Sequence, residues 1–328
     1  MKRILITGIN GFVGSNFTEK WKESHVLYGL DINQTPKNEV KAIYGWDQLA
    51  EIPETDAIVH LAGKAHDTKN RSEAAEYFAV NTGLTQKIFD YFLQSDAQKF
   101  IFFSSVKAAT DSVPSEVLTE ELVPAPVGPY GESKIRAEEF ILRTQNQDPR
   151  VKNKKIYILR PCMIHGPGNK GNLNLLYNVV SKGIPWPLGA FDNRRSFCSI
   201  DNMAFVVEQL IVRDDVPSGI YQVCDDEPLS TNELIRLINE SLGKKTRIWE
   251  LPKSFMTGAA GICDALHLPL NKERLRKLTE NYVVSNEKIK SALGIEKMPV
   301  LAREGIRKTL ESFLKNDSTP VDDNDGIL

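Results

Sequence analysis

The sequence predicts an α/β fold: a doubly wound parallel sheet, followed by a smaller and mostly helical region. Short apolar runs alternate with amphipathic helical patterns through the first half of the 328 residues, which is typical of parallel sheets covered by helices on both faces. A glycine-rich turn follows the first of these runs. After Arg160 the alternation ends, and a stretch rich in glycine and proline leads into further helical patterns.

The first thirty residues form the unit on which the rest of the prediction depends. An apolar run at residues 2–6 leads into the turn TGINGFVG at 7–14, an amphipathic segment, and a second apolar run that ends on Asp31. This order predicts a strand, a tight turn, a helix and a strand. Glycines in such a turn let backbone N–H groups approach a pyrophosphate at the helix N-terminus. An acid after the second strand can bind an adenosine ribose and would repel a 2′-phosphate, so Asp31 favours NAD over NADP in a Rossmann-type unit.

The remaining elements can be placed in chain order. Strands are expected at 57–62, 99–105 and 155–160, and helices at 73–94 and 129–144, whereas a strand between 37 and 44 is weakly marked. Helices are then expected at 173–181, 202–212 and 231–242, the last with Thr231 as its N-cap, and extended pieces at 220–223 and 282–284.

These elements suggest two domains and a tail. We expect a Rossmann domain made of residues 1–168 and 197–221, and a substrate-binding domain made of 169–196 and 222–315. Residues 316–328 are polar and acidic, which is typical of a disordered tail.

Composition excludes several classes of function. The chain is 41% hydrophobic and 26% charged with a net charge of −2, so it has no excess of basic residues for nucleic acid or an acidic membrane. Its four cysteines are scattered, which favours a reducing compartment without a metal site or disulfides. No apolar run approaches the roughly 18 residues of a membrane span, and no signal pattern precedes the first strand. We therefore expect a cytoplasmic protein.

Tyr130 and Lys134 carry the catalytic pattern. Their spacing places a phenol and an ammonium on one helix face. A free tyrosine has a pKa of about 10, too high for a base at neutral pH, and a nearby positive charge lowers it. The pattern Y-x-x-x-K alone is common on surface helices. Here it follows a dinucleotide-binding half and a strand that ends in Ser104 and Ser105, at the sheet edge where ligands bind in such folds.

With these motifs the sequence resembles the extended short-chain dehydrogenase/reductase family, and specifically its NAD-dependent nucleotide-sugar epimerase/dehydratase branch. The resemblance covers about residues 1–315, and within the branch it is most similar to UDP-glucose/UDP-N-acetylglucosamine 4-epimerases and related 4-ketoreductases. The motifs that carry it are TGINGFVG, Asp31, VHLA at 59–62, Asn81, the two serines, Tyr130 with Lys134, Arg160-Pro161, HGPG at 165–168 and RSFCSIDN at 195–202.

The resemblance implies catalytic roles for Ser105, Tyr130 and Lys134. Tyr130 would be the general base that takes a proton from a sugar hydroxyl as hydride leaves to nicotinamide. Lys134 would bind the nicotinamide ribose and hold the pKa of Tyr130 low, and Ser105 would hydrogen-bond the reacting oxygen. The implied cofactor contacts are Gly8, Gly11, Phe12, Val13, Gly14, Asp31, Asp47, Leu61, Ala62, Asn81, Ser104, Tyr130 and Lys134.

The resemblance also implies a site for a UDP-sugar. Arg195 matches the family arginine that pairs with the diphosphate, for which a bidentate guanidinium is suited. Asn172 and Leu173 lie where the family recognises uracil and the sugar phosphate. A second arginine is expected at Arg274 or Arg276, and Ser105 would also touch the substrate.

Departures from the family pattern limit the reaction. Val106 and Lys107 stand where the family's dehydratases have an Asp-Glu pair, so loss of water is not expected, and Lys107 is a candidate substrate contact. His60 is interpreted as a structural histidine, and the adjacent acids Glu138 and Glu139 as a solvated face.

Three hypotheses follow for the function. The first is an NAD-dependent 4-epimerase of a UDP-hexose or UDP-N-acetylhexosamine that acts through a 4-keto intermediate. The second is an NAD(P)H-dependent 4-ketoreductase of a UDP-4-keto-6-deoxy-N-acetylhexosamine in surface-polysaccharide synthesis. The third, a dinucleotide-sensing regulator without catalysis, is opposed by the intact catalytic residues. The resemblance implies a homodimer through the helices at 81–94 and 130–144, and leaves the sugar open.

Overall fold

A parallel sheet of seven strands lies at the centre of the protein, which is described by a computed structural model at residues 1–65, 73–169, 171–265 and 272–318. The strand order is β3-β2-β1-β4-β5-β6-β9, and every pairing is parallel. The predicted α/β class is therefore confirmed. The strands are β1 (Arg3–Thr7), β2 (Val26–Leu30), β3 (Ala42–Tyr44), β4 (Ala57–His60), β5 (Lys99–Phe103), β6 (Lys155–Pro161) and β9 (Gly219–Val223).

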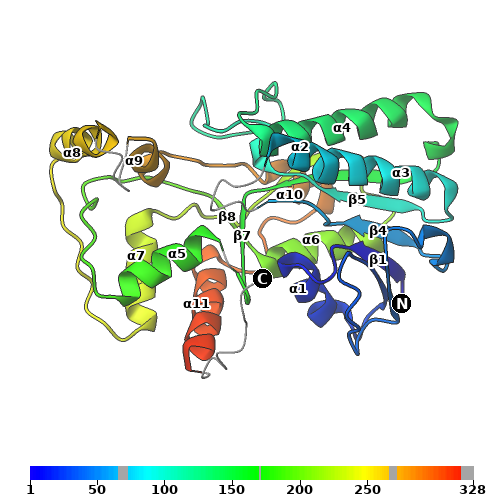
Figure 1. Ribbon diagram of the computed structural model, residues 1–328, viewed down its shortest axis with the longest axis horizontal. Helices are drawn as coiled ribbons and strands as arrows, with labels where there is room; N and C mark the ends of the chain where they lie inside the picture. The colour runs from blue at the N-terminus through cyan, green and yellow to red at the C-terminus, as the bar shows by residue number, and fades with distance from the viewer. Residues whose placement is uncertain (66–72, 170, 266–271, 319–328) are drawn as a thin grey trace.

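Helices cover both faces of this sheet (Figure 1). On one face, α1 (Phe12–Trp21) and α6 (Ile200–Val212) pack on strand residues such as Ile4 and Ile6. On the other, α3 (Leu84–Gln94) and α4 (Pro129–Gln147) pack on residues such as Leu5. Because successive strand residues face opposite sides, burial of both faces requires continuous apolar runs.

The strand order places a crevice between β1 and β4. The chain runs from β1 outward to β2 and β3, then returns to β4 on the other side of β1. In open parallel sheets, ligands bind at the carboxyl ends of the strands where the order reverses in this way. The glycine turn follows β1, Leu61 and Ala62 follow β4, and Ser104 and Ser105 follow β5, so all of these reach the same edge.

The weakly marked strand exists as β3. Two other elements differ in detail from expectation. The helix expected at 73–94 is continuous but contains a π turn, η2 (Phe78–Gly83), between α2 (Ala74–Tyr77) and α3.

The N-cap expected for α7 (Thr231–Ser241) is wrong by one residue. Ser230 is the cap: its hydroxyl accepts from the Glu233 N–H, and the Glu233 carboxylate accepts from the Ser230 N–H. This reciprocal pair is a capping box, which Thr231 could not form with Glu233 at the same spacing.

The second half of the chain builds a smaller helical region beside the sheet (Figure 1). One apolar cluster joins α5 (Asn172–Ser181), α7 and α11 (Ala302–Ser318), and another includes residues of α8 (Lys253–Ala265) and α9 (Lys272–Thr279). A short parallel pair, β7 (Met163–His165) and β8 (Phe197–Ser199), lies between this region and the sheet, and α10 (Glu287–Leu293) packs near β9.

The expected tail is partly wrong, because α11 continues through Ser318. Residues 319–328 lie outside the described part of the chain. No helix within the described residues is long and apolar enough to cross a membrane.

Candidate active site

A cavity of about 400 Å³ lies at the carboxyl ends of the central strands. Its walls come from the N-terminus of α1, the segments after β4, β5 and β6, the first turns of α4 and α5, and the loop before β8. The structure therefore brings together residues predicted for the site from distant parts of the chain. Those that line the cavity are Phe12, Val13, Leu61, Ser104, Ser105, Lys107, Tyr130, Lys134, Asn172 and Arg195.

Ser105, Tyr130 and Lys134 meet in this cavity, as predicted. The Ser105 hydroxyl lies beside the Tyr130 phenol, close enough to lower the pKa of that phenol. Ser105 also caps the short helix η3 (Val106–Ala108), where its oxygen accepts from the Lys107 N–H at 3.2 Å. The buried Lys134 ammonium donates to the Phe103 carbonyl at 2.8 Å and lies 5.1 Å from the Phe102 ring centroid.

The electrostatics of Tyr130 differ from expectation. Burial raises the pKa of Tyr130, the nearby Ser105 hydroxyl partly offsets this, and Tyr77 raises it further. The expected lowering of this pKa by Lys134 is wrong in this structure, where the ammonium donates to the Phe103 carbonyl. Burial lowers the pKa of Lys134 to about 8, against the charge of Glu138, which raises it. At neutral pH the pair is thus a phenol and a cation.

The glycine turn has the shape of a dinucleotide cradle. Gly8 has φ +69°, and a Cβ there would lie 2.9 Å from the Ala62 nitrogen. A Cβ on Gly14 would lie 2.7 Å from the Ile9 Cα, so side chains would open both contacts. Gly11 is exposed and caps α1. The turn and helix N-terminus therefore fit the pyrophosphate of a dinucleotide.

Asp31 lies beside this turn, at the end of β2. Its carboxylate is 8% exposed and accepts from the backbone N–H groups of Asn10 and Asn33, each at 3.0 Å. Lys37, which sequence reasoning missed, donates to the Ile9 carbonyl at 2.8 Å. It lies in the weakly patterned segment before β3, where no motif singles it out.

Two other cofactor predictions are not supported by side-chain geometry. Asp47 is exposed in the loop after β3 and does not line the cavity. Asn81 is fully buried in the π turn, where it accepts from the Lys64 N–H at 2.7 Å and donates to the Ser133 hydroxyl at 2.9 Å. It therefore braces the loop after β4 against α4 and does not present its side chain to a groove.

Arg195 and Lys107 provide the positive charge on the substrate side. Burial lowers the pKa of Arg195, against Glu280, Tyr282 and Asp111, which raise it. The Lys107 ammonium lies 2.6 Å from the Asp111 carboxylate and 5.1 Å from the ring centroid of Tyr282. Two cationic side chains therefore line the cavity, each with an acid nearby.

Predictions for the other substrate residues have mixed outcomes. Asn172 lines the cavity, whereas the Leu173 side chain is 2% exposed and packs in the apolar cluster of α5. Arg276 is exposed and pairs with Asp111 at 3.6 Å. Arg274 lies in α9, but its side chain is outside the part of the chain that the structure describes.

Asn169 is a cavity residue that sequence reasoning missed. It is buried, and its Oδ1 accepts from the Gly171 N–H at 2.8 Å. Its Nδ2 has no acceptor among the described residues. Its position directly after the HGPG motif is the signal that could have identified it.

Two further predictions concern buried polar groups. His60 is structural, as interpreted: its ring nitrogens lie 2.7 Å from the Thr7 hydroxyl and 2.9 Å from the Thr85 hydroxyl. The solvated face expected at Glu138 is wrong, because this carboxylate is fully buried and paired with Arg160 at 2.6 Å. Glu139 is exposed, as expected.

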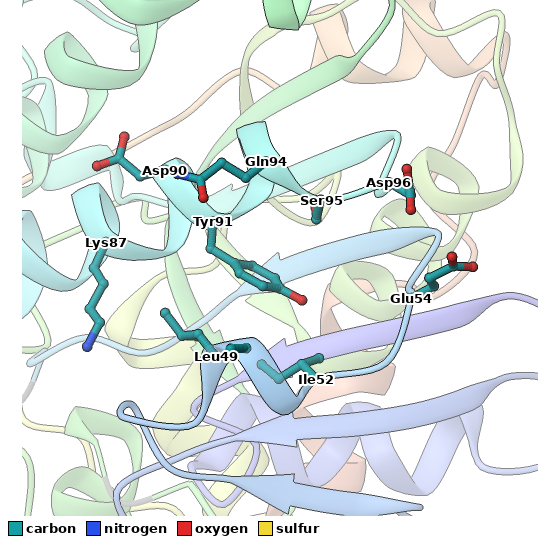
Figure 2. Close-up of a pocket in the computed structure, with 10 residues that line it drawn as sticks. Leu49, Ile52, Glu54, Lys87, Asp90, Tyr91, Gln94, Ser95 and Asp96 are labelled. Atoms are coloured by element: carbon teal, nitrogen blue, oxygen red, sulfur yellow. The ribbon is translucent and has the colours of Figure 1, made fainter.

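A second hollow, of about 480 Å³, lies between α3 and the segment that joins β3 to β4. Figure 2 shows Tyr91 of α3 above Leu49 and Ile52, with Asp90 and Glu54 at the margins. No residue predicted for the site lines this hollow, so the predicted chemistry belongs to the cavity beside Tyr130.

Comparisons with known proteins agree with this geometry. The profile of the NAD dependent epimerase/dehydratase family matches residues 4–224. A UDP-glucose 4-epimerase of Vibrio cholerae is 30% identical over 329 aligned positions, covering 96% of this chain and 96% of that protein. An N-acetyl-α-D-glucosaminyl-diphospho-ditrans,octacis-undecaprenol 4-epimerase of Escherichia coli O157:H7 is 26% identical, covering 76% and 75%.

A solved structure shares the fold. The UDP-glucose 4-epimerase of Thermotoga maritima, with UDP-glucose, has a TM-score of 0.73 at 19% identity and covers 96% of this chain and 99% of that one. The glycine cradle, the cavity that Ser105, Tyr130 and Lys134 line, and the family profile agree. The chain therefore belongs to the NAD dependent epimerase/dehydratase family, a family of enzymes whose cofactor is NAD.

Proposed function

We propose that the chain is a 4-epimerase of a UDP-hexose or UDP-N-acetylhexosamine that acts through a 4-keto intermediate. The observation that carries the proposal is that one cavity is lined by Ser105, Tyr130, Lys134 and Arg195 together. The relative of V. cholerae, which covers nearly the whole chain, supports the same reaction.

NAD would lie along the glycine turn. Gly8, Gly11 and Gly14 would pack against its pyrophosphate near the N–H groups of Phe12 and Val13, and Asp31 would bind the adenosine ribose. Held there, NAD would supply reversible hydride transfer at C4 of the sugar.

The residues of this chain would move the proton and hold the sugar. Tyr130 would take the proton of the C4 hydroxyl as its phenolate and give it back when the 4-keto sugar is reduced. Ser105 would hydrogen-bond the same oxygen. The positive charge of the oxidised cofactor, together with the Ser105 hydroxyl, would favour the phenolate against the burial that raises its pKa.

The substrate diphosphate would lie against Arg195. A guanidinium can hold two phosphate oxygens at once. The Arg195 side chain is partly buried in the cavity wall. Asn172 and the side-chain amide of Asn169 would provide further contacts to the nucleotide-sugar. Lys107 would touch the sugar beside Ser105. Because this lysine stands where the family's dehydratases have an acid, loss of water is not expected.

The test is an NMR assay of the protein as purified, with no nicotinamide added, against UDP-glucose and UDP-N-acetylglucosamine. Appearance of the C4 epimer supports the proposal, because an epimerase regenerates its cofactor in each turnover. Folded, NAD-containing protein that forms no epimer from either sugar argues against it.

One observation favours a second candidate, a 4-ketoreductase of a UDP-4-keto-6-deoxy-N-acetylhexosamine. Burial raises the pKa of Tyr130, so the resting side chain is the phenol that would protonate a C4 oxygen during reduction. Consumption of NADH or NADPH in the presence of a UDP-4-keto-6-deoxy sugar would identify this reaction.

We further propose that the cavity lies between two domains, at residues 1–168 with 197–221 and at 169–196 with 222–315. We also propose a homodimer through α3 and α4, as the family resemblance implies. Light scattering of the purified protein tests the dimer.

A further inference from the structure

Glu138 is a buried acid on the catalytic helix. Its carboxylate is fully buried, and Arg160 of β6 is 2% exposed. The Arg160 Nε donates to Oε1 of Glu138 at 3.0 Å, and Nη2 donates to Oε2 at 2.6 Å. The Ser104 hydroxyl donates to Oε1 as well. Each carboxylate oxygen is thus held by a donor from β6, and one of them also by a donor that follows β5.

The position of this acid relates it to the catalytic residues. Tyr130, Lys134 and Glu138 follow one another at four-residue spacing, so they share one face of α4. Lys134 donates to the Phe103 carbonyl, and the next residue, Ser104, donates to Glu138. At the end of β5, Phe103 therefore accepts the hydrogen bond of Lys134, and the next residue, Ser104, orients Glu138.

Stability alone does not explain such a pair. Removing two charges from water is costly, and well-packed apolar residues often replace a buried ion pair at no loss of stability. The pair does not line the cavity, so it is not a substrate contact. Its effect must pass through a neighbour that does line the cavity.

Two neighbours of Glu138 line the cavity: Ser104, which donates to its carboxylate, and Lys134, which lies one helical turn away and carries a charge. The charges around Lys134 come from three elements. His60 of β4 is buried and uncharged, because burial and the charge of Lys134 hold its pKa well below the usual range. Arg160 of β6 is a cation and Tyr130 of α4 a phenol. Among the described residues, Glu138 is the acid whose charge raises the pKa of Lys134.

We propose that Glu138, held by Arg160 and Ser104, is a positioning residue that keeps Lys134 charged and directed at the cofactor side of the cavity. This rests on the proposed function only for turnover; the effect on the cofactor holds for any hydride transfer at this site. Without the carboxylate, Lys134 would lose its counter-charge and would face an unpaired Arg160. Both changes would release the Lys134 proton at lower pH.

The experiment compares Glu138→Gln with Glu139→Gln, a matched control at the exposed neighbouring acid. NADH binding, followed by fluorescence, and turnover are each measured from pH 6 to pH 10. We expect the Glu138→Gln variant to lose NADH affinity at a pH lower by about one unit than the parent, whereas the control keeps the parent profile. Equal profiles for all three proteins would overturn the proposal.

Two further variants separate charge from folding. Glu138→Asp keeps the carboxylate, so its profile should stay within about 0.3 pH unit of the parent even where turnover falls. If Glu138→Gln does not fold, the double variant Glu138→Gln/Arg160→Met leaves no buried charge unpaired and should still move the profile to lower pH. Two outcomes would contradict a role through charge. In one, the Glu138→Asp profile shifts as far as that of Glu138→Gln. In the other, the folded double variant keeps the parent profile. Because NADH binding is read directly, the result does not depend on finding epimerisation.

Discussion

The Ser105 hydroxyl lies beside the Tyr130 phenol, and its influence opposes that of burial in setting the pKa of Tyr130. The two residues come from different elements: Ser105 follows β5 and Tyr130 begins α4. Their contact therefore depends on how α4 packs against the end of β5. It also makes the protonation of the proposed base sensitive to a single neighbouring hydroxyl.

Replacement of Ser105 should change both the rate and its pH dependence. Ser105→Ala removes the hydroxyl that lowers the pKa of Tyr130, so the phenolate forms only at higher pH. We expect turnover to fall about 100-fold and the acidic limb of the pH–rate profile to move to higher pH. The measurement is the initial rate of C4 epimerisation across pH 6–9. Ser115→Ala, at an exposed loop serine, is the control, and an unmoved acidic limb in Ser105→Ala would contradict the role.

Tyr130→Phe tests the base itself. The change removes the oxygen that exchanges the proton and leaves the ring that packs in the cavity wall. We expect turnover to fall by at least about 1,000-fold while NAD stays bound, because the cofactor cradle is built by other elements. Turnover by NMR and the absorbance of bound cofactor are the two readouts. Near-normal turnover would refute the assignment of Tyr130.

The parent enzyme should lose cofactor affinity on the alkaline side. Burial lowers the pKa of Lys134 to about 8, so the ammonium is present below this pH and is lost as the pH rises through it. We therefore expect NADH affinity to weaken above about pH 8, and Lys134→Met to have weak affinity with no such limb. NADH titrations at fixed ionic strength decide this. If the Lys134→Met variant still loses NADH affinity above about pH 8, a group other than Lys134 causes the loss, and the prediction is wrong.

Much of the fold was predictable because its signals are local. The apolar runs, the glycine turn and Y-x-x-x-K each lie within a short stretch, and the structure places them as expected. The misses share a different cause. In the sequence, Glu138 looks like part of a charged surface, because its partner Arg160 lies on β6 and meets it only in the folded protein. Asn81 points inward because of a π turn that no sequence pattern indicates.

The substrate side was predicted least well, since its residues meet only through tertiary contacts. Tyr282 lies far along the chain from Lys107 yet lies beneath its ammonium, and Asp111 joins Lys107 to Arg276 across two regions. No spacing in the sequence signals such contacts. Leu173 was placed in the site from its motif position, but the phase of α5 turns its side chain into the core.

Arg195 should determine affinity for the nucleotide-sugar. Arg195→Met removes a guanidinium that lines the cavity, and we expect the KM for the UDP-sugar to rise about 10- to 100-fold with NAD binding unchanged. Arg194→Met is a matched control, because the Arg194 side chain is next in the sequence but is exposed and does not line the cavity. Steady-state kinetics and an NAD titration make the comparison. A KM equal to that of the control would remove Arg195 from the substrate site.

The glycine turn should tolerate no side chain at Gly14. A Cβ there would contact the Gly8 carbonyl oxygen and lie 2.7 Å from the Ile9 Cα, and these are backbone atoms that cannot rotate away. We expect Gly14→Ala to lower the free energy of unfolding by about 1–3 kcal/mol and to release NAD, because the cradle must open to fit the methyl group. Gly258→Ala is the control: a Cβ at this position in α8 meets nothing within 4 Å, and alanine favours the helix. Denaturant unfolding and bound-cofactor absorbance measure both effects. Parent-like stability and NAD content in Gly14→Ala would mean that α1 can move away from the turn without loss of the cofactor cradle.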